Sequence, residues 1–257
     1  MRRIILLIVI SLMFASDAFG WGQKGHDVVA YVAEQNLPRR VARKVEKALE
    51  GHSLVYYSNW LDNASHTAEY AHTSTWHYAN VDEGYTYQTM PKNADGDVVT
   101  AIDEIAAQLK SGKLSAEQES VALRMLIHLM GDLHCPMHAG HKSDYGGNTV
   151  EVFYFGRPSK LHSVWDSSLV ESAHNWSYSE WQREIDRQPR AVDKQMQQGS
   201  VEEWFSETVA VCDGIYKDMP AGTKISYNEV SKYAPIIEQQ LLKGGLRLAK
   251  LLKEIYK

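Results

Sequence analysis

The chain has 257 residues and a formal net charge of −5 at pH 7, a size that suits one well-cored domain. A protein that binds duplex nucleic acid by neutralising phosphates with its own side chains is usually basic, and this composition excludes such a surface. Phosphate recognition would need a local source of positive charge, such as bound cations. The two cysteines, Cys135 and Cys212, either form a disulfide or remain two buried thiols.

Residues 1–20 have the pattern of a secretory signal peptide. Two arginines begin it, an apolar run fills residues 4–14, and a small-x-small cleavage site ends at Gly20. The apolar run is too short to span a bilayer and no stop-transfer pattern follows it. The sequence therefore predicts export, to the periplasm or the medium, with cleavage after Gly20.

Cleavage after Gly20 would make Trp21 the N-terminus of a mature chain covering residues 21–257. The new α-amino group is partly unprotonated near neutral pH, and His26 follows closely in the sequence. The amino group and carbonyl of Trp21 and the His26 imidazole could together chelate a metal ion. The alternative interpretation is that Trp21 is only a buried aromatic residue.

Most of the mature chain has the apolar periodicity of helices. Helices are predicted at 25–37, 39–50, 98–109, 116–133 after a capping box at Ser115, 160–173, 178–187, 201–217 and 229–256. Only residues 148–155 alternate as a strand, which we expect in a small hairpin. Gly244 and Gly245 should weaken or kink the final helix. The pattern predicts a mainly α, single-domain helical globule with a small β-hairpin.

Two predicted helices repeat one arrangement of metal-binding residue types. His128 and Asp132 are four residues apart, as are His162 and Asp166, which places imidazole and carboxylate on one helix face. A histidine among the apolar residues of a core helix needs a partner, because a buried unpaired polar group is costly. The partner is either another protein group or a metal ion, and imidazole with carboxylate suits zinc better than magnesium.

Further candidate ligands lie outside this repeat. His138 follows Asp132 after a Cys-Pro turn that can return it to the same site, and Asp62 and His77 stand in aromatic-rich stretches. The other histidines lack such pairing and are interpreted as surface residues or neighbours of the ligands: His52, His66, His72, His134, His141 and His174. His134 should point to a different face from Asp132.

Motifs along the whole mature chain resemble the S1/P1 nuclease family of zinc-dependent, single-strand-preferring nucleases and 3′-nucleotidases. They are WGQKGH at 21–26, WLD at 60–62, WHY at 76–78, HLMGDLHCPMH at 128–138, GGN at 146–148, LHSVWD at 161–166 and KGGLRLA at 243–249. The resemblance implies a catalytic domain at 21–257 with a fold of the phospholipase C/P1 nuclease type. It also implies single-stranded nucleic acid and 3′-nucleotides as substrates, a monomer, and no stable membrane association.

The resemblance further implies three zinc ions. One would be held by Asp62, His77, His128 and Asp132, a second by His138, His162 and Asp166, and a third by the Trp21 amino and carbonyl groups, His26 and Asp132. In the mechanism that the family suggests, a hydroxide between the two ions bridged by Asp132 attacks phosphorus, and the remaining ion stabilises the leaving 3′-oxygen. The products would carry 5′-phosphates, and Asp132 and Asp62 are the predicted catalytic residues.

Three residues are implied in substrate binding. Tyr78 stands where the family has an aromatic residue that stacks a base, a contact worth ~1–3 kcal/mol; alternatively, it is a packed aromatic residue covering the metals. Asn80 stands where fungal relatives have an acidic residue and could bond a base edge, and Asn148 ends the Gly-Gly-Asn motif. Ser65 replaces an arginine of the fungal relatives, so another cation compensates, or the turnover or preferred substrate differs.

Two alternative functions remain open at this stage. A zinc-dependent phospholipase C has a related fold and ligand set, but it would want an apolar entrance, and the sequence has no basic amphipathic helix with aromatic residues on its apolar face. A non-enzymatic, secreted zinc-binding protein is indicated only by Ser65. Hydrolysis of a 3′-nucleotide, of a choline phosphodiester, or of neither would separate the three functions.

Overall fold

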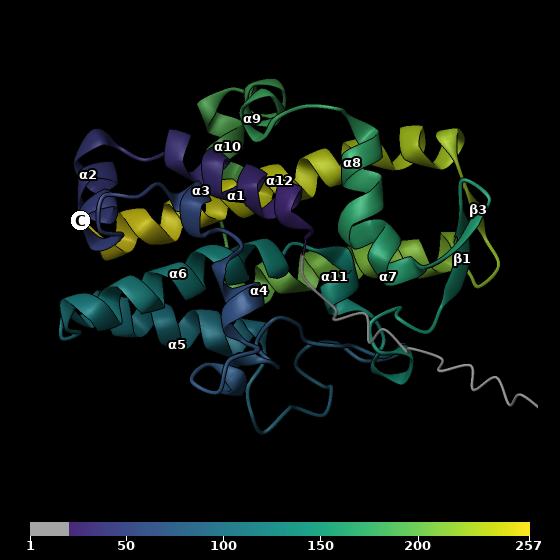
Figure 1. Cartoon of the computed structure of the whole chain (residues 1–257), viewed down its shortest axis with the longest axis horizontal. Helices are drawn as coiled ribbons and strands as arrows, with labels where there is room; N and C mark the ends of the chain where they lie inside the picture. The colour runs from purple at the N-terminus through teal and green to yellow at the C-terminus, as the bar shows by residue number, and fades with distance from the viewer. Residues whose placement is uncertain (1–20) are drawn as a thin grey trace, which may run out of the picture.

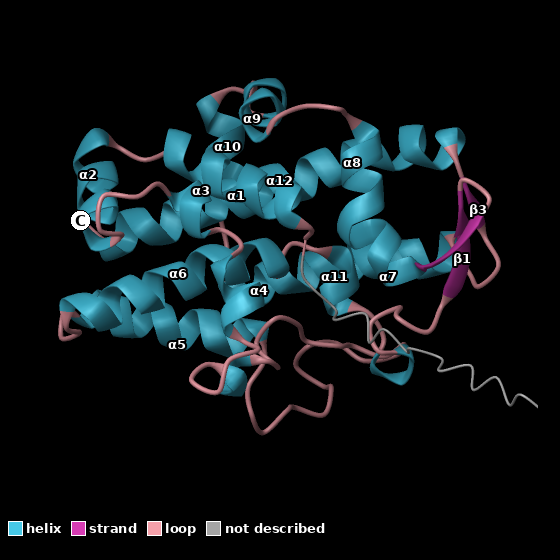
Figure 2. Ribbon diagram, in the orientation of Figure 1, coloured by secondary structure: helices cyan, strands magenta, loops and turns pink. Residues whose placement is uncertain are grey.

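The computed structural model describes residues 21–257, so the predicted leader and its cleavage lie outside the described residues. Helices dominate the fold, and three short strands form one sheet (Figure 2). The predicted mainly α fold with a small β-hairpin is therefore confirmed. Within the described part of the chain, no helix is long and apolar enough to cross a membrane.

Short connections join most elements, and the longest loop, residues 74–97, follows the 3₁₀ helix η1. The α-helices are α1 (Gln23–Gln35), α2 (Arg39–Ala48), α3 (Leu54–Tyr57), α4 (Trp60–Ala64), α5 (Val98–Ser111), α6 (Ala116–Asp132), α7 (Leu161–Ser163), α8 (Leu169–Ala173), α9 (Tyr178–Ile185), α10 (Arg190–Met196), α11 (Val201–Asp218) and α12 (Tyr227–Ile255). The strands are β1 (Glu151–Tyr154), β2 (Arg157–Lys160) and β3 (Lys224–Ile225). The 3₁₀ helices are η1 (Ala71–Thr73), η2 (Pro136–Ala139) and η3 (Lys142–Asp144), and η4 (Val164–Ser168) is a π-helical turn.

Helices α1 and α12 lie side by side through the middle of the molecule (Figure 1). Gly244 and Gly245 belong to their contact, because a Cβ atom on Gly245 would lie 2.4 Å from Val32 Cβ. Helix α12 continues through both glycines without interruption. The missing side chains thus allow two helix backbones to approach closely.

The predicted capping box of α6 is present: Ser115 Oγ accepts a hydrogen bond from Gln118 N at 3.2 Å. The predicted hairpin is also present, since β1 pairs with β2 in antiparallel register. Strand β3 pairs with β1 in parallel register and was not predicted. The continuous helix predicted over 160–173 is wrong in one respect, because the π-helical turn η4 separates α7 from α8.

Two interpretations of buried residues are settled by the structure. Cys135 and Cys212 are both buried and free, so the alternative of two unpaired thiols is correct. His134 is fully buried, so of its two interpretations, a surface residue or a neighbour of the ligands, the first is wrong. Its ring bonds Met130 O and Arg247, which places it on a different face from Asp132, as predicted.

Candidate metal centre

The predicted metal-ligating residues converge on one buried place, although they come from distant segments. They are Trp21 before α1, His26 in α1, Asp62 in α4, His77 in the loop 74–97, His128 and Asp132 in α6, His138 in η2, His162 in α7 and Asp166 in η4. None of the eight imidazole and carboxylate residues is more than 9% exposed. Burying so many polar and charged groups is costly unless each finds a partner.

The ligand atoms of one predicted set are spaced as in a tetrahedral metal site. His77 Nδ1 and His128 Nε2 lie 2.9 and 3.1 Å from Asp132 Oδ2 and 3.1 Å from each other. Asp62 Oδ1 lies 3.2 Å from His128 Nε2 and 3.9 Å from His77 Nδ1. Around a tetrahedral zinc ion with metal–ligand distances near 2.1 Å, ligand atoms stand roughly 3.4 Å apart. His77, His128 and Asp132 therefore fit one ion, and Asp62 lies close to both imidazoles of that set.

Hydrogen bonds to main-chain carbonyls fix the tautomers of three histidines. His128 Nδ1 donates to Ser58 O at 2.8 Å and His162 Nδ1 donates to Gly146 O at 2.7 Å. His138 Nδ1 donates to the carbonyl oxygen of His77. Because a carbonyl oxygen only accepts, each ring carries its proton on Nδ1, and Nε2 is left as the lone-pair nitrogen. This is the usual orientation of a metal-ligating histidine.

Several buried atoms of the centre have no hydrogen-bond partner among residues 21–257. They are both ring nitrogens of His26, Asp62 Oδ1, His77 Nε2 and Asp132 Oδ1. Such atoms are rare in folded proteins and each costs free energy. Carboxylate oxygens and imidazole nitrogens are also the donors that zinc prefers. Asp62 Oδ1, Asp132 Oδ1 and one ring nitrogen of His26 therefore fit bound cations.

Close packing places His26 beside the first ligand set. Its ring stacks on His128 with the centroids 4.1 Å apart. A Cβ atom on Gly131 would lie 2.5 Å from His26 Nδ1, so only glycine leaves room for the ring at this point of α6. His26 Nε2 lies 3.5 Å from Asp132 Oδ1, which is the carboxylate oxygen facing away from His77.

The main chain at the start of the mature domain is fixed beside another predicted ligand. Gly22 N donates to Asp166 O at 2.7 Å, and a Cβ atom on Gly22 would lie 2.3 Å from Ser167 Oγ. The Trp21 side chain is fully buried, so it is a buried aromatic residue. Its backbone lies next to η4 through the hydrogen bond of Gly22.

Electrostatic interactions within the centre are strong. Burial raises the pKa of the Asp132 carboxyl, but the His128 and His138 imidazoles outweigh burial and hold that pKa well below its usual range. Burial, with Asp132 and Asp62 nearby, raises the pKa of Asp166 well above its usual range. The Asp166 carboxylate is therefore short of positive charge, which a cation would supply.

Sequence reasoning missed one residue of the centre. Cys135, His138 and Asp166 each bring one ligand atom to within 4.8 Å of the others. The His138 ring also stacks on His162 with centroids 5.4 Å apart. The only sequence signal for Cys135 is its place in the turn before His138, where the sequence indicates either a disulfide partner or a buried thiol.

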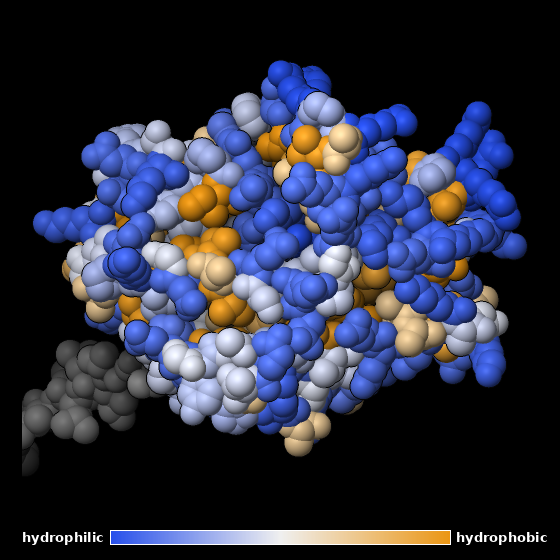
Figure 3. All heavy atoms as spheres, turned by 180° about the vertical axis from the view of Figure 1, so that it is seen from behind, coloured by the Kyte–Doolittle hydropathy of each residue, from blue (hydrophilic) through white to orange (hydrophobic). Residues whose placement is uncertain are grey.

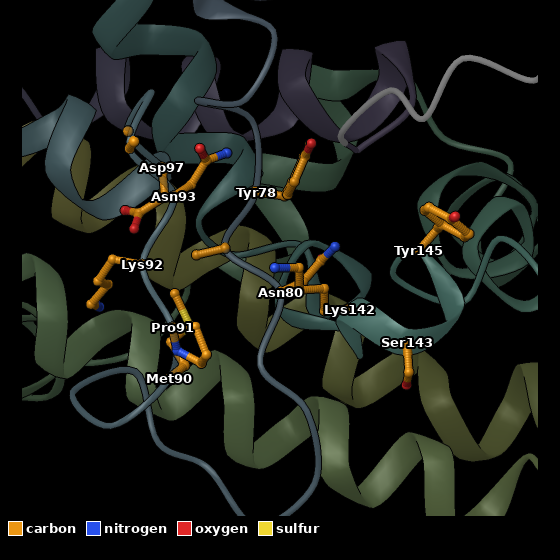
Figure 4. Close-up of a pocket in the computed structure, with 13 residues that line it drawn as sticks. Tyr78, Asn80, Met90, Pro91, Lys92, Asn93, Asp97, Lys142, Ser143 and Tyr145 are labelled. Atoms are coloured by element: carbon orange, nitrogen blue, oxygen red, sulfur yellow. The ribbon is translucent and has the colours of Figure 1, made fainter.

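A cleft of about 630 Å³ contains two of the three predicted substrate-binding residues, Tyr78 and Asn80. Figure 4 shows them between Tyr145 on one side and the segment that follows Met90 on the other. Asn148 is not among the lining residues, and its amide donates to Tyr145 O at 2.8 Å. The lining residues that sequence reasoning missed include Lys92, Lys142 and Tyr145.

Comparison with known proteins identifies relatives over nearly the whole chain. The model of the S1/P1 Nuclease family matches residues 21–257. The chain is 30% identical to Endonuclease 2 of Arabidopsis thaliana, over 98% of this chain and 97% of that protein. It is 24% identical to Nuclease S1 of Aspergillus oryzae, over 97% and 96% of the two chains. It is 25% identical to Nuclease P1 of Penicillium citrinum, over 92% and 98%.

Proposed function

Since the chain belongs to the S1/P1 nuclease family and is therefore a hydrolase of phosphate esters, we propose that it is an exported, zinc-dependent endonuclease. It cleaves single-stranded DNA and RNA to 5′-phosphate products and removes phosphate from 3′-nucleotides. Residues 21–257 form its catalytic domain, and it acts as a monomer. The observation that carries the proposal is the close approach of His77, His128 and Asp132, whose ligand atoms lie 2.9–3.1 Å apart, with Asp62 Oδ1 3.2 Å from His128 Nε2.

The three proposed zinc ions use the ligands of the three predicted sets. When bound, they would supply positive charge at the scissile phosphate and lower the pKa of water towards ~7. Asp132 belongs to two sets, and its two oxygens face different imidazoles: Oδ2 faces His77 and His128, and Oδ1 faces His26 and His138. Asp62 completes the first set, and its Oδ1 lies 3.2 Å from His128 Nε2.

The cleft beside the centre is the proposed binding site for the nucleotide. Tyr78 directly follows the ligand His77 in the chain, so a base stacked on its ring would place the adjoining phosphate near the ions. Stacking needs an unstacked base, which accounts for a single-strand preference. Asn80 lines the same cleft and offers amide donors and an acceptor to a base edge.

A lysine in the cleft could replace the arginine that is absent at Ser65. Ser65 Oγ donates to Asp62 O at 3.1 Å and supplies no charge. Lys92 Nζ lies 2.8 Å from the centroid of the Tyr87 ring and donates to Tyr87 O, so it is engaged within its own loop. Lys142 lines the cleft and is exposed, which makes it the better candidate for a phosphate contact.

A lipid phosphodiester is supported less well than a nucleotide. The face of the molecule shown in Figure 3 is mostly hydrophilic, and its hydrophobic residues lie in separate small areas. The cleft is lined by many polar side chains, including Asn80, Asn93 and Ser143. These groups suit the hydrogen-bonding edges of a nucleobase better than the surface of a lipid aggregate.

Zinc content and phosphate release from a 3′-nucleotide, measured on protein that begins at Trp21, test the proposal. About three zinc ions per chain, with activity abolished by EDTA and restored by Zn²⁺, are the expected result. Three zinc ions with hydrolysis of a choline phosphodiester alone would move the substrate to phospholipid. Three zinc ions without hydrolysis of any ester would indicate a zinc-binding protein, and fewer than two tightly bound ions would overturn the metal assignment.

A further inference from the structure

Helix α2 concentrates positive charge in a chain that is acidic overall. Five of the nine residues from 39 to 47 are Lys or Arg and one is acidic, whereas the whole chain has a net charge of −5. Four of these cations are exposed and together form what we call the basic face of α2: Arg39, Arg40, Arg43 and Lys47. The exclusion of a basic surface from overall composition is therefore wrong for α2, although it holds for the chain as a whole.

The basic face has no acidic partner in the protein. Within residues 21–257, none of its four side chains forms an ion pair or a hydrogen bond. Lysines on other helices are paired, since Lys110, Lys232 and Lys243 each lie 2.7–2.9 Å from a carboxylate oxygen. The charge of the basic face is thus available to a partner from outside the chain.

Two of these cations stand where they do not favour the helix itself. Arg39 and Arg40 belong to the first turn of α2, which contains no acidic residue and is not capped by a side chain. A cation in the first turn opposes the helix dipole and destabilises the helix. The stability of α2 therefore does not explain their presence, and an anionic partner does.

The basic face is connected to the metal centre along α6. Helices α2, α3 and α4 each contact α6, and Figure 1 shows them in that order beside it. The chain just after α2 is fixed there, because Glu50 accepts hydrogen bonds from Ser120 at 3.1 Å and from Arg124 at 2.9 Å. Ser120 precedes the predicted ligand Asp132 by twelve residues, which is about 18 Å at 1.5 Å per residue. A stacked nucleic-acid strand covers that distance in roughly five nucleotides, at ~3.4 Å each.

Exposed aromatic rings follow α2 on the way to the metal centre. Tyr56 in α3 is 64% exposed, and its ring stacks on that of His52 with the centroids 4.0 Å apart. Both residues lie in the chain between α2 and Asp62 in α4. Proteins that bind single-stranded nucleic acid without sequence preference combine a cationic surface with aromatic rings on which bases stack. This part of the surface has both features.

We propose that the basic face of α2 binds phosphates of a single-stranded nucleic acid outside the cleft, roughly five or more nucleotides from the bond that is cleaved. The inference rests on the proposed function, because the occupant is the uncleaved part of the proposed substrate. Charge complementarity favours this occupant, since each nucleotide adds a negative charge and the basic face has four unpaired cations. A 3′-nucleotide is too short to reach α2, so the basic face should promote the cleavage of long strands alone.

The salt dependence of cleavage by the variant Arg39→Gln/Arg40→Gln/Arg43→Gln tests the proposal. On zinc-containing protein that begins at Trp21, kcat/KM is measured for an oligothymidylate of about 20 nucleotides and for a 3′-nucleotide. Each phosphate contact to a single strand adds ~0.7 to the slope of log K against log salt, so losing three contacts should reduce the slope by ~2. Between about 50 and 200 mM salt, wild type should therefore lose roughly 20-fold more activity on the oligonucleotide than the variant loses. Hydrolysis of the 3′-nucleotide should be the same in both proteins.

A second triple variant with the same change of net charge is the control. Arg157→Gln/Lys217→Gln/Lys224→Gln replaces exposed residues in β2, at the end of α11 and in β3, and it should keep the wild-type slope. Urea unfolding checks that both variants fold. Replacing Arg39 and Arg40 should not lower stability, because cations in the first turn are unfavourable.

The outcomes separate this inference from the proposed function. An unchanged slope in the α2 variant, or an equal decrease in the control, would overturn the inference and leave the proposed function standing. An unchanged slope together with loss of binding to anionic phosphatidylglycerol vesicles would assign the basic face to a membrane surface instead. Hydrolysis of neither substrate by the wild type would overturn the proposed function.

Discussion

Asp132 Oδ1 lies 3.5 Å from His26 Nε2, and neither atom has a hydrogen-bond partner within residues 21–257. The other oxygen of the same carboxylate is 2.9 Å from His77 Nδ1. A carboxylate that presents each oxygen to a different imidazole is arranged to bridge two cations. The full burial of Asp132 makes the arrangement costly without them, because a buried charge needs charged partners.

Replacing Asp132 with asparagine keeps the shape of the side chain and removes its charge. Because the residue belongs to two of the three ligand sets, Asp132→Asn should lower the zinc content by more than one ion per chain. Hydrolysis of a 3′-nucleotide should fall roughly 10²-fold or more. Metal analysis and steady-state kinetics check this, with Asp103→Asn on the exposed side of α5 as the matched control. Undiminished zinc content in Asp132→Asn would contradict the bridging role.

The N-terminus of the mature chain should itself be a ligand. Gly22 N is bonded to Asp166 O and the Trp21 side chain is buried, so the residue 21 amino group is held near the centre. An extra residue before Trp21 converts that amine into an amide, a poor ligand, and should cost one zinc ion per chain. Metal content of a chain beginning at Gly20 is compared with that of the chain beginning at Trp21, and a tag after Lys257 serves as the control. Equal zinc content and equal activity would show that the amine is not a ligand.

Tyr78 should contribute to substrate affinity rather than to metal binding. Tyr78→Ala should raise KM for a single-stranded oligonucleotide by about 5- to 150-fold, the equivalent of ~1–3 kcal/mol of stacking, with zinc content unchanged. Tyr227→Ala, at a residue 80% exposed in α12, is the control. If Tyr78 only covers the metals, the substitution would instead loosen zinc and leave KM unchanged.

Much of the fold, and the residue types of the candidate metal centre, could be predicted because both have local sequence signals. Helical periodicity and the Ser115 capping box locate α6, and the spacing of His128 and Asp132 places both side chains on one face of it. Each of these signals depends on residues that are three or four positions apart in the chain, so it can be recognised from the sequence alone. The distances that join His128 to Asp62 and His77 could not be derived from spacing, and the family resemblance supplied that grouping.

Features that depend on tertiary packing were missed. The π-helical turn at Asp166 leaves no clear mark in hydrophobic periodicity, since it adds only one residue to a helical turn. The two-residue strand β3 exists only because β1 lies beside it. His134 gave no sign of burial because its partner Arg247 is 113 residues away in the chain.

The glycine at the contact of α1 and α12 gives a prediction for stability. Gly245→Ala should destabilise the protein by about 1–3 kcal/mol, because its Cβ atom would lie 2.4 Å from Val32 Cβ and 2.8 Å from Val29 O. Gly214→Ala in α11 is the matched control, since within residues 21–257 a Cβ there would meet no atom within 4 Å beyond its chain neighbours and its own helix backbone. That control should be neutral or stabilising, because alanine favours a helix over glycine by ~1 kcal/mol. Urea unfolding of both variants checks this, and equal effects would mean that the helix contact is not tight.

The pair of His134 and Arg247 predicts how stability depends on pH. Arg247 Nη1 donates to His134 Nε2 at 3.0 Å, and His134 Nδ1 donates to Met130 O at 2.9 Å, so the imidazole is neutral in the folded protein. Burial first, and then the Arg247 charge, hold the pKa of His134 well below its usual value of 6.5. The unfolded chain therefore binds a proton below about pH 6.5 that the folded chain does not bind.

The contribution of His134 to stability is complete above pH 6.5 and is lost as the pH falls below that value. One such group changes the free energy of unfolding by up to ~1.4 kcal/mol per pH unit. His134→Gln keeps a donor and an acceptor without a titratable group, so its stability should fall less steeply between pH 6.5 and pH 5. Urea unfolding across this range measures the difference in slope, with His52→Gln at an exposed residue as control. Identical slopes for wild type and His134→Gln would contradict the prediction, because they would mean that the imidazole is not kept neutral in the folded protein.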